Sequence, residues 1–199
     1  MMIHEKFYID DAGWINRVKR VYSPNFDERP SDTNINLIVI HSISLPPGEY
    51  GGPWIDKLFT NSLPKMVHPY FTQLEGMRVS AHLLIRRNGV LVQYVPLHHR
   101  AWHAGISIWE GRPRCNDYSI GIELEGVDTI LYTDIQYTIL MEIVQALMTF
   151  YPKITLDRIV GHCDIAPGRK TDPGPAFDWT RLRQALHNVK NPTAKNGGL

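Results

Sequence analysis

The feature that most constrains the fold is a run of four apolar residues, Leu-Ile-Val-Ile, at positions 37–40. The run contains β-branched residues and has no polar side, so it predicts a strand that is covered on both faces. Such strands occur in parallel or mixed sheets with further layers packed on each side. We therefore expect a central buried strand that ends at His41, inside an α/β fold.

Two further β segments, residues 82–87 and 90–95, flank the pair Asn88-Gly89. This pair readily adopts the positive φ angles of a type I′ turn, which predicts a hairpin. A short strand is also expected over residues 159–162, so that His162, like His41, lies at the end of an apolar strand.

Residues 119–125 alternate in polarity, which predicts another strand. One face would carry Ile120, Ile122 and Leu124, and the other Ser119, Gly121, Glu123 and Glu125. The two glutamates are therefore expected on a polar side of the sheet.

Two helices follow from their start signals. Thr133 and Gln136 have the spacing of a capping box, and a helical apolar pattern continues from there until Pro152. A second helix is expected after Asp178 as N-cap. Its apolar positions are Trp179, Leu182, Leu186 and Val189. Strands and helices alternate along the chain, so we predict an α/β class with a mixed sheet flanked by helices.

Composition limits the organisation and the partners. The chain has 199 residues, 43% hydrophobic residues and a formal net charge of +1, which predicts one folded domain over residues 1–190 and disfavours nucleic acid as a partner. The polar, glycine-containing tail at 191–199 is expected to be disordered. The start lacks a secretory pattern, and residues 135–150 are too short and polar to span a membrane. We expect a soluble monomer whose two cysteines are reduced thiols.

One long segment, residues 44–79, does not fit the alternating pattern. Long connections in small domains are usually functional, and a short helix is expected to start at Pro53. We hypothesise that this segment is a lid, with Trp54, Leu58 and Phe59 covering the site.

The residues also limit the chemistry. The chain has no Gly-x-Ser-x-Gly motif and no phosphate-binding glycine-rich loop. His41 and His162 at strand ends could bind zinc together with a third ligand. Asp164, Asp172 and Cys163 are the candidates, and Cys163 would point away from His162 if the strand stayed extended.

Five segments can be compared with known families: HSISLPPGE at 41–49, SAHLLIRRNG at 80–89, RAWHAG at 100–105, NDYSIGIELEG at 116–126 and GHCDIAPGRKTDPGP at 161–175. Together they resemble the zinc-dependent N-acetylmuramoyl-L-alanine amidases, and within them the cytosolic AmpD branch. The resemblance implies the fold shared by phage-type amidases and peptidoglycan recognition proteins.

The resemblance also implies roles for particular residues. It places the zinc ligands at His41, His162 and Asp172, in preference to the other candidates. It implies that Lys170 stabilises the transition state and that Glu123 transfers protons during amide hydrolysis.

Substrate contacts are implied as well. Arg78, Trp102 and Arg114 match positions at which the branch contacts its ligand. His82 and His103 fit the family pattern but are not ligands there, so we expect them to support the site.

The implied activity is hydrolysis of the amide between 1,6-anhydro-N-acetylmuramic acid and L-alanine in muropeptides. The process would be peptidoglycan recycling in the bacterial cytoplasm. The alternatives are a non-catalytic module that binds peptidoglycan fragments and a phage-type amidase that degrades the wall. Filled ligand positions argue against the first, and the absent secretory signal and long 44–79 segment argue against the second.

Overall fold

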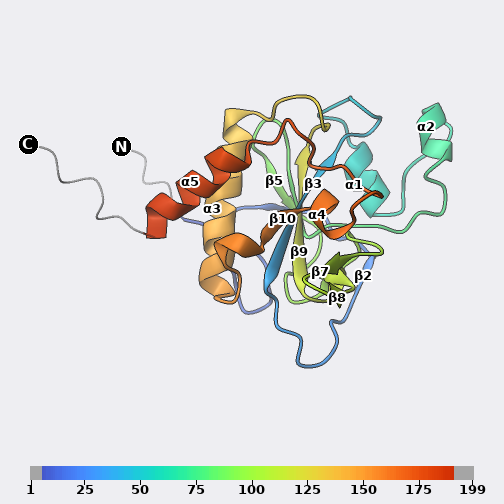
Figure 1. The fold of residues 1–199 in the computed structure, drawn as a ribbon. Coiled ribbons are helices and arrows are strands. Elements are labelled where there is room, and N and C mark those ends of the chain that lie inside the picture. Colours follow the sequence, from blue (N-terminus) through green and yellow to red (C-terminus); the bar gives the residue numbers. More distant parts are fainter. Residues whose placement is uncertain (1–5, 191–199) are drawn as a thin grey trace, which may run out of the picture.

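The computed structural model describes residues 6–190, without the side chains of residues 188–190. At its centre is a six-stranded mixed sheet in the order β1-β5-β4-β9-β3-β10, in which only the β4–β5 pair is antiparallel (Figure 1). The strands of this sheet are β1 (Lys19–Arg20), β3 (Leu37–Ile43), β4 (Leu83–Ile85), β5 (Leu91–Gln93), β9 (Ser119–Glu125) and β10 (Ile159–Gly161). Two small ribbons pair β2 (Phe26–Asp27) with β6 (Arg100–Ala101) and β7 (Ile108–Trp109) with β8 (Arg112–Pro113). The predicted mixed sheet flanked by helices is confirmed.

Five α-helices and two short 3-10 helices complete the described part. They are α1 (Trp54–Phe59), α2 (Pro69–Thr72), α3 (Asp134–Phe150), α4 (His162–Ile165), α5 (Trp179–Lys190), η1 (Cys115–Asp117) and η2 (Leu156–Arg158). The capping box is confirmed, because the Thr133 hydroxyl accepts from the Gln136 N–H at 3.3 Å and Gln136 accepts from the Thr133 N–H at 3.0 Å. The cap of α5 is confirmed too, since Asp178 accepts from the Arg181 N–H at 2.9 Å.

The two faces of the sheet are covered differently. Helices α3 and α5 pack on one face, where Leu140, Ile143, Leu182 and Leu186 meet the buried isoleucines of β3 and β9 (Figure 1). The side chain of Val189, expected in the same stripe, lies outside the description. On the other face Leu37 and Val39 pack with Ala104, Cys115, Tyr118, Val160 and Ile165. Because alternate residues of a strand share a face, His41 points to the same side of the sheet as Leu37 and Val39.

The central strand is longer than predicted. β3 continues through His41 to Ile43, because Ser42 and Ile43 remain paired with Leu124 and Glu125 of the parallel strand β9. Conversely, β10 stops at Gly161, and His162 begins the helical turn α4. Asp164 favours this turn by accepting from the Gly161 N–H at 2.7 Å. The expectation that both histidines end strands was therefore wrong for each of them.

The hairpin is confirmed, but its turn is not type I′. Of the two central residues only Gly89 has a positive φ, at 82°. The Gly89 N–H donates to the Arg86 carbonyl at 2.9 Å, and the Arg86 N–H donates to Val90 at 2.9 Å. This longer loop needs one left-handed residue instead of two, so Asn88 avoids that strain.

The 44–79 segment contains the expected helix at Pro53, but α1 is part of a core. Leu58 and Phe59 are buried in a second apolar cluster with Leu84 and Tyr94, on the sheet itself. These side chains are not available to cover a site. The lid hypothesis, as it was built on them, is wrong.

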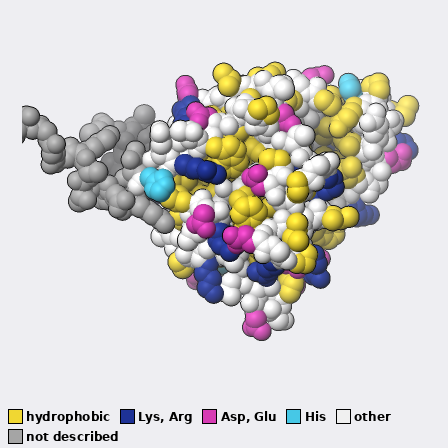
Figure 2. Space-filling view, in the orientation of Figure 1, with side chains coloured by type: hydrophobic (Ala, Val, Ile, Leu, Met, Phe, Trp, Pro, Cys, Tyr) yellow, Lys and Arg dark blue, Asp and Glu magenta, His cyan; other side chains and the backbone are white. Residues whose placement is uncertain are grey.

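The remaining expectations concern surface charge, the cysteines, membrane spans and the C-terminal tail. Figure 2 shows acidic and basic side chains interspersed on the face in view. Both cysteines are free thiols, Cys115 buried and Cys163 half-buried, as predicted. Across residues 6–190, no helix combines the length and the apolar character needed to cross a bilayer. The tail at 191–199, expected to be disordered, lies outside the described residues.

Candidate active site

Three potential metal ligands converge on the face of the sheet opposite α3. His41 comes from β3, His162 from the start of α4, and Asp172 from the loop that follows α4. The Nδ1 atoms of the two histidines are 3.0 Å apart, and Asp172 Oδ2 is 3.3 Å from His41 Nδ1 and 3.1 Å from His162 Nδ1. One nitrogen from each histidine and one carboxylate oxygen thus face a single point.

Backbone contacts place Asp172 at that point. Its carbonyl accepts from the Cys163 N–H at 2.9 Å, which returns the loop onto α4. The next residue, Pro173, has its carbonyl held by the Tyr132 hydroxyl at 2.8 Å. Gly174 then passes so close to Asp128 that a Cβ would lie 2.3 Å from its Cα, and its φ is +77°. Only glycine fits this position, so the loop needs this residue type in order to follow its path past Asp128.

The other two ligand candidates are outside the cluster. Asp164 is occupied by the Gly161 N–H, and the Cys163 sulfur lies 3.8 Å from an Asp164 oxygen. Asp172 is therefore the candidate that the fold brings to both histidines.

The electrostatics of the cluster suit a cation. Burial lowers the pKa of His41 to about 4, so the imidazole is neutral at pH 7. Burial alone would raise the pKa of Asp172, but the contacts of its carboxylate with His162 and His41 outweigh it and lower that pKa. Two imidazole nitrogens and a carboxylate oxygen are a donor set that zinc accepts in catalytic sites. The residues present therefore fit a zinc ion.

Glu123 lies beside the cluster, because it is the register partner of His41 in the parallel β3–β9 pair. Burial, and then the charge of Asp172, raise the pKa of its carboxyl well above the usual value, while Lys170 opposes the shift. Its Oε2 atom is buried and has no hydrogen-bond partner among the described residues. A buried carboxyl with one free oxygen is a candidate for proton transfer.

Glu125, two residues later on the same face, provides a comparison. It too is buried, so the side expected to be polar is an interior one. Its oxygens accept from Arg86 at 3.1 Å, from the Gly51 N–H at 2.8 Å and from the Arg87 N–H at 3.1 Å. Glu125 is thus a structural acid whose hydrogen bonds are satisfied, whereas Glu123 keeps a free oxygen.

Lys170 lies on the loop between α4 and Asp172, with its side chain exposed. Its positive charge contributes to lowering the pKa of both His41 and Glu123. The loop therefore brings this ammonium group to the cluster, and the chain offers a cation next to a buried acid.

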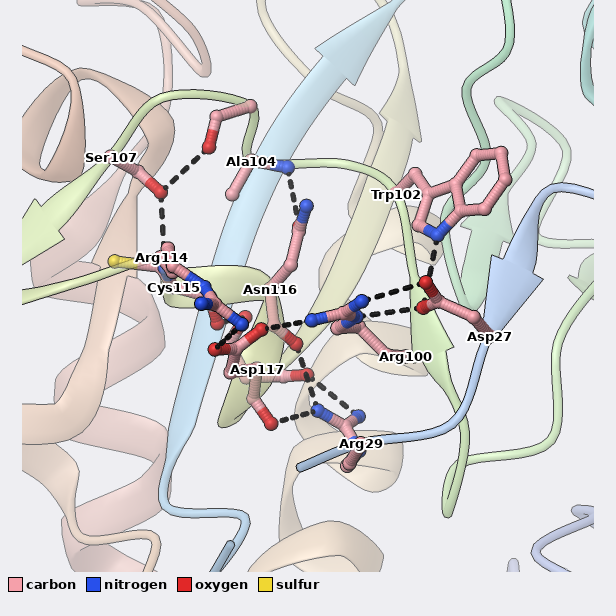
Figure 3. Close-up of polar contacts among 12 residues, drawn as sticks. Asp27, Arg29, Arg100, Trp102, Ala104, Ser107, Arg114, Cys115, Asn116 and Asp117 are labelled. Carbon is pink, nitrogen blue, oxygen red and sulfur yellow. Dashed lines mark hydrogen bonds and ion pairs between the residues drawn. The ribbon is translucent and has the colours of Figure 1, made fainter. Parts of the chain in front are cut away.

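Two of the expected substrate contacts belong to one polar network, which sequence reasoning missed (Figure 3). The Trp102 indole donates to Asp27 at 3.1 Å, and the largely exposed Arg114 pairs with Asp117 at 2.9 Å. Arg100 joins the two carboxylates: it binds Asp27 through two nitrogens at 2.7 and 2.6 Å and Asp117 through a third at 2.5 Å. The only signal in the sequence is that Arg100 stands two residues before Trp102.

Arg78 lies elsewhere. Its exposed side chain lines a pocket of about 450 Å³ between α1 and α2, together with Asn61 and Phe71. The contacts that join Trp102 to Arg114 do not include it.

Two histidines and a carboxylate around one point, with a buried free carboxyl beside them, form the kind of site that metal-dependent hydrolases use. The comparison with known families specifies the class. A model described as N-acetylmuramoyl-L-alanine amidase matches residues 31–175, and the chain belongs to that family. The resemblance seen in the sequence is confirmed.

Individual relatives agree. The 1,6-anhydro-N-acetylmuramyl-L-alanine amidase AmpD of Citrobacter freundii is 60% identical over 173 residues, which are 87% of this chain and 92% of the relative. A crystal structure of a selenomethionine AmpD derivative superposes with a TM-score of 0.87 at 58% identity, covering 89% of this chain and 98% of the other. The Escherichia coli amidase AmiD, in complex with the substrate anhydro-N-acetylmuramic acid-L-Ala-D-γ-Glu-L-Lys, gives 0.54 at 30% identity, covering 89% and 65%.

Proposed function

We propose that this protein hydrolyses the amide bond between 1,6-anhydro-N-acetylmuramic acid and L-alanine in muropeptides, as a step of peptidoglycan recycling. Relatives that share more than half of its residues over most of its length bear the name of this activity. The observation that carries the proposal is the convergence of His41, His162 and Asp172 beside Glu123, whose buried Oε2 atom has no hydrogen-bond partner among the described residues. The bacterial cytoplasm and a monomeric state belong to the same proposal.

The proposed cofactor is one zinc ion, which His41, His162 and Asp172 would hold through one ligand atom each. Three protein ligands are the number that catalytic zinc sites use. When bound, zinc supplies Lewis acidity, which makes water more acidic and polarises a carbonyl group.

Glu123 takes a proton from the attacking water at its free Oε2 atom. The water oxygen bonds to the lactyl carbonyl carbon, and the carbon–nitrogen bond then breaks. The same carboxyl returns the proton to the departing L-alanine nitrogen, so protons balance across the step. Its raised pKa suits this double role, since the group must hold the proton between the two transfers.

Lys170 stabilises the negative charge that develops on the carbonyl oxygen. Its exposed side chain can reach a bound substrate, and its charge already acts on His41 and Glu123. A positioned cation at a developing oxyanion contributes more to the transition state than to the ground state.

Arg78 and Arg114 are proposed to bind the carboxylates of the stem peptide, and Trp102 to pack against the substrate. Arg114 is the better supported of the two cations, because Asp117 holds it in place while its side chain stays 67% exposed.

Mass spectrometry of muropeptide cleavage tests this function. The zinc-loaded protein should release free stem peptide and anhydro-N-acetylmuramic acid from an anhydro-muropeptide, and a matched reducing muropeptide would show whether the anhydro ring matters. Binding without cleavage would indicate a non-catalytic module, and release of stem peptide from polymeric wall only would indicate a wall-degrading amidase.

A further inference from the structure

The turn after β6 contacts both histidines of the cluster through two adjacent residues. The His103 ring lies 2.9 Å from the Nε2 atom of His41, measured to Nδ1 of His103. The carbonyl of Ala104 lies 3.1 Å from His162 Nε2. Asn116 holds this turn, because its side-chain oxygen accepts from the His103 N–H at 3.1 Å. The same oxygen accepts from the Ala104 N–H at 2.8 Å (Figure 3).

The directions of the hydrogen bonds that lead to His41 follow from the carbonyl group of Cys115, which can only accept. The Ser119 hydroxyl lies 2.6 Å from the carbonyl oxygen of Cys115, so its single hydrogen points there. Ser119 must then accept from His103 Nε2, at 3.2 Å, which places the His103 hydrogen on Nε2. His103 Nδ1 is left as an acceptor, and it receives the hydrogen on His41 Nε2. The Nδ1 atom of His41 therefore presents its lone pair to the cluster.

The contact with Ala104 gives His162 the same tautomer as His41. The Ala104 carbonyl cannot donate, so His162 Nε2 carries the hydrogen between them. Arg169 does not compete for that nitrogen, although it lies 3.5 Å away. Both hydrogens of its Nη2 atom are taken by the carbonyls of Ala104 and Ile106, each at 2.7 Å. The Nδ1 atom of His162 is thus also a lone-pair donor.

Packing fixes the His103 ring in this place. Gly121 on β9 lies beneath it, and a Cβ there would approach the ring to 2.5 Å at Cγ and 2.6 Å at Nδ1. Residues 119, 121 and 123 share one face of β9. On this face of the strand, Ser119 binds the His103 ring through its hydroxyl, and Gly121 leaves the space that the ring fills. The carboxyl of Glu123 comes next.

We propose that His103 and Asn116 are positioning residues that set the tautomers of both histidine ligands before any metal binds. His103 acts on His41 through its ring, and Asn116 acts on both ligands by holding the peptide units of His103 and Ala104. The inference rests on the metal site proposed above, but it concerns residues outside the sets proposed to bind metal and substrate. Contacts of this kind typically change metal affinity by roughly 10- to 100-fold.

Nitrogen-15 NMR of the histidine rings in the metal-free wild-type protein tests the assignment without any variant. The expected result is a hydrogen on Nε2 of His41, His103 and His162, with Nδ1 of His103 unprotonated. A hydrogen on Nδ1 of His103 would overturn the inference, because His103 would then donate to His41 Nε2 and the hydrogen of His41 would lie on Nδ1.

Variants test the consequence. His103→Leu removes the acceptor for His41 and should weaken zinc binding by roughly 10- to 100-fold in chelator competition, whereas His103→Asn keeps an oxygen near the Nδ1 position and should restore part of it. His82→Leu is the matched control. His82 is also buried, 5.7 Å from His103 between ring centroids, and accepts from the Gly121 N–H at 3.0 Å; its hydrogen bonds within the described residues do not involve His41 or His162.

The outcomes separate the two proposals. Zinc affinity of His103→Leu equal to that of the wild type, or an equal loss in His82→Leu, would overturn the positioning role. Failure of the wild type itself to bind zinc would overturn the proposed metal site, while the NMR result on the metal-free protein would still decide the tautomers.

Discussion

Substitution of Gly121 by alanine should disturb both stability and zinc affinity, by amounts that the geometry allows us to work out. The new Cβ would lie 2.5 Å from His103 Cγ, about 1 Å inside the normal contact distance of roughly 3.5 Å. The ring must then move by about an ångström, which breaks its 2.9 Å hydrogen bond with His41. Overpacking of this kind costs about 1–3 kcal/mol.

Part of that cost is offset. Alanine is favoured over glycine inside a strand by roughly 0.5–1 kcal/mol, and Gly121 does not have a positive φ that would strain it. The net loss is then about 0–2.5 kcal/mol, or up to roughly 10 °C in Tm, at 2–4 °C per kcal/mol for a chain of this size. Zinc affinity should fall by roughly 10- to 100-fold, because the His41 tautomer is no longer held.

Calorimetry of the metal-free protein and chelator competition measure the two effects separately. Gly52→Ala is a suitable control, because its Cβ would meet only the Trp54 ring at 3.0 Å, in a half-exposed loop. A Gly121→Ala protein with wild-type zinc affinity would refute the reasoning, whatever its Tm.

Four further predictions concern the site and its network. Asp172→Ala should bind no zinc at stoichiometric levels and should lose activity, and metal analysis showing full retention would count against Asp172 as a ligand. Lys170→Ala should lower kcat by roughly 100-fold or more while zinc stays bound; a raised KM with normal kcat would indicate binding instead. Glu123→Gln should also lower kcat with zinc retained, because the amide cannot carry the proton, and near-normal turnover would exclude the proton-transfer role. The hydrogen bond from Arg100 lowers the pKa of Asp27, so its ionised form stabilises the fold above pH 4 and that contribution disappears as pH falls below it. Thermal melts should therefore show Asp27→Asn less stable than the wild type at pH 7 and the difference shrinking in acid; a constant difference would contradict the assignment.

Local patterns predicted the elements whose stabilising contacts are themselves local. The β9 strand was predicted with its observed bounds, since its alternation is a property of seven consecutive residues. The α3 start followed from Thr133 and Gln136, which bond to each other. The end of β3 was missed because polar residues such as Ser42 look like a strand end, although pairing with β9 continues the strand.

His41, His162 and Asp172 were expected together from the sequence and the family resemblance, but their arrangement in the fold was not. His41 and His162 were recognised through the apolar runs that precede them, while their convergence with Asp172 depends on the return of a loop. The Asp27–Arg100–Asp117 network could not be predicted, because its members lie far apart in the sequence and charged residues carry no periodic signal. The alternation of the strand alone could not show that Glu125 is fully hydrogen-bonded and Glu123 is not, since this depends on which of them meets Arg86.

The three clustered residues come from distant parts of the sequence, so a metal ion bound by them would stabilise the folded chain. His41 lies in the central strand, whereas His162 and Asp172 belong to the last quarter of the sequence. A zinc ion held by all three would close a loop of more than a hundred residues and would bind the folded chain in preference to the unfolded one. At a free concentration 100 times its Kd, a ligand of this kind adds about 2.7 kcal/mol to the free energy of unfolding. The lifetime of the protein in a cell would then depend on zinc availability, and starvation for the ion would remove the enzyme through proteolysis as well as through loss of turnover.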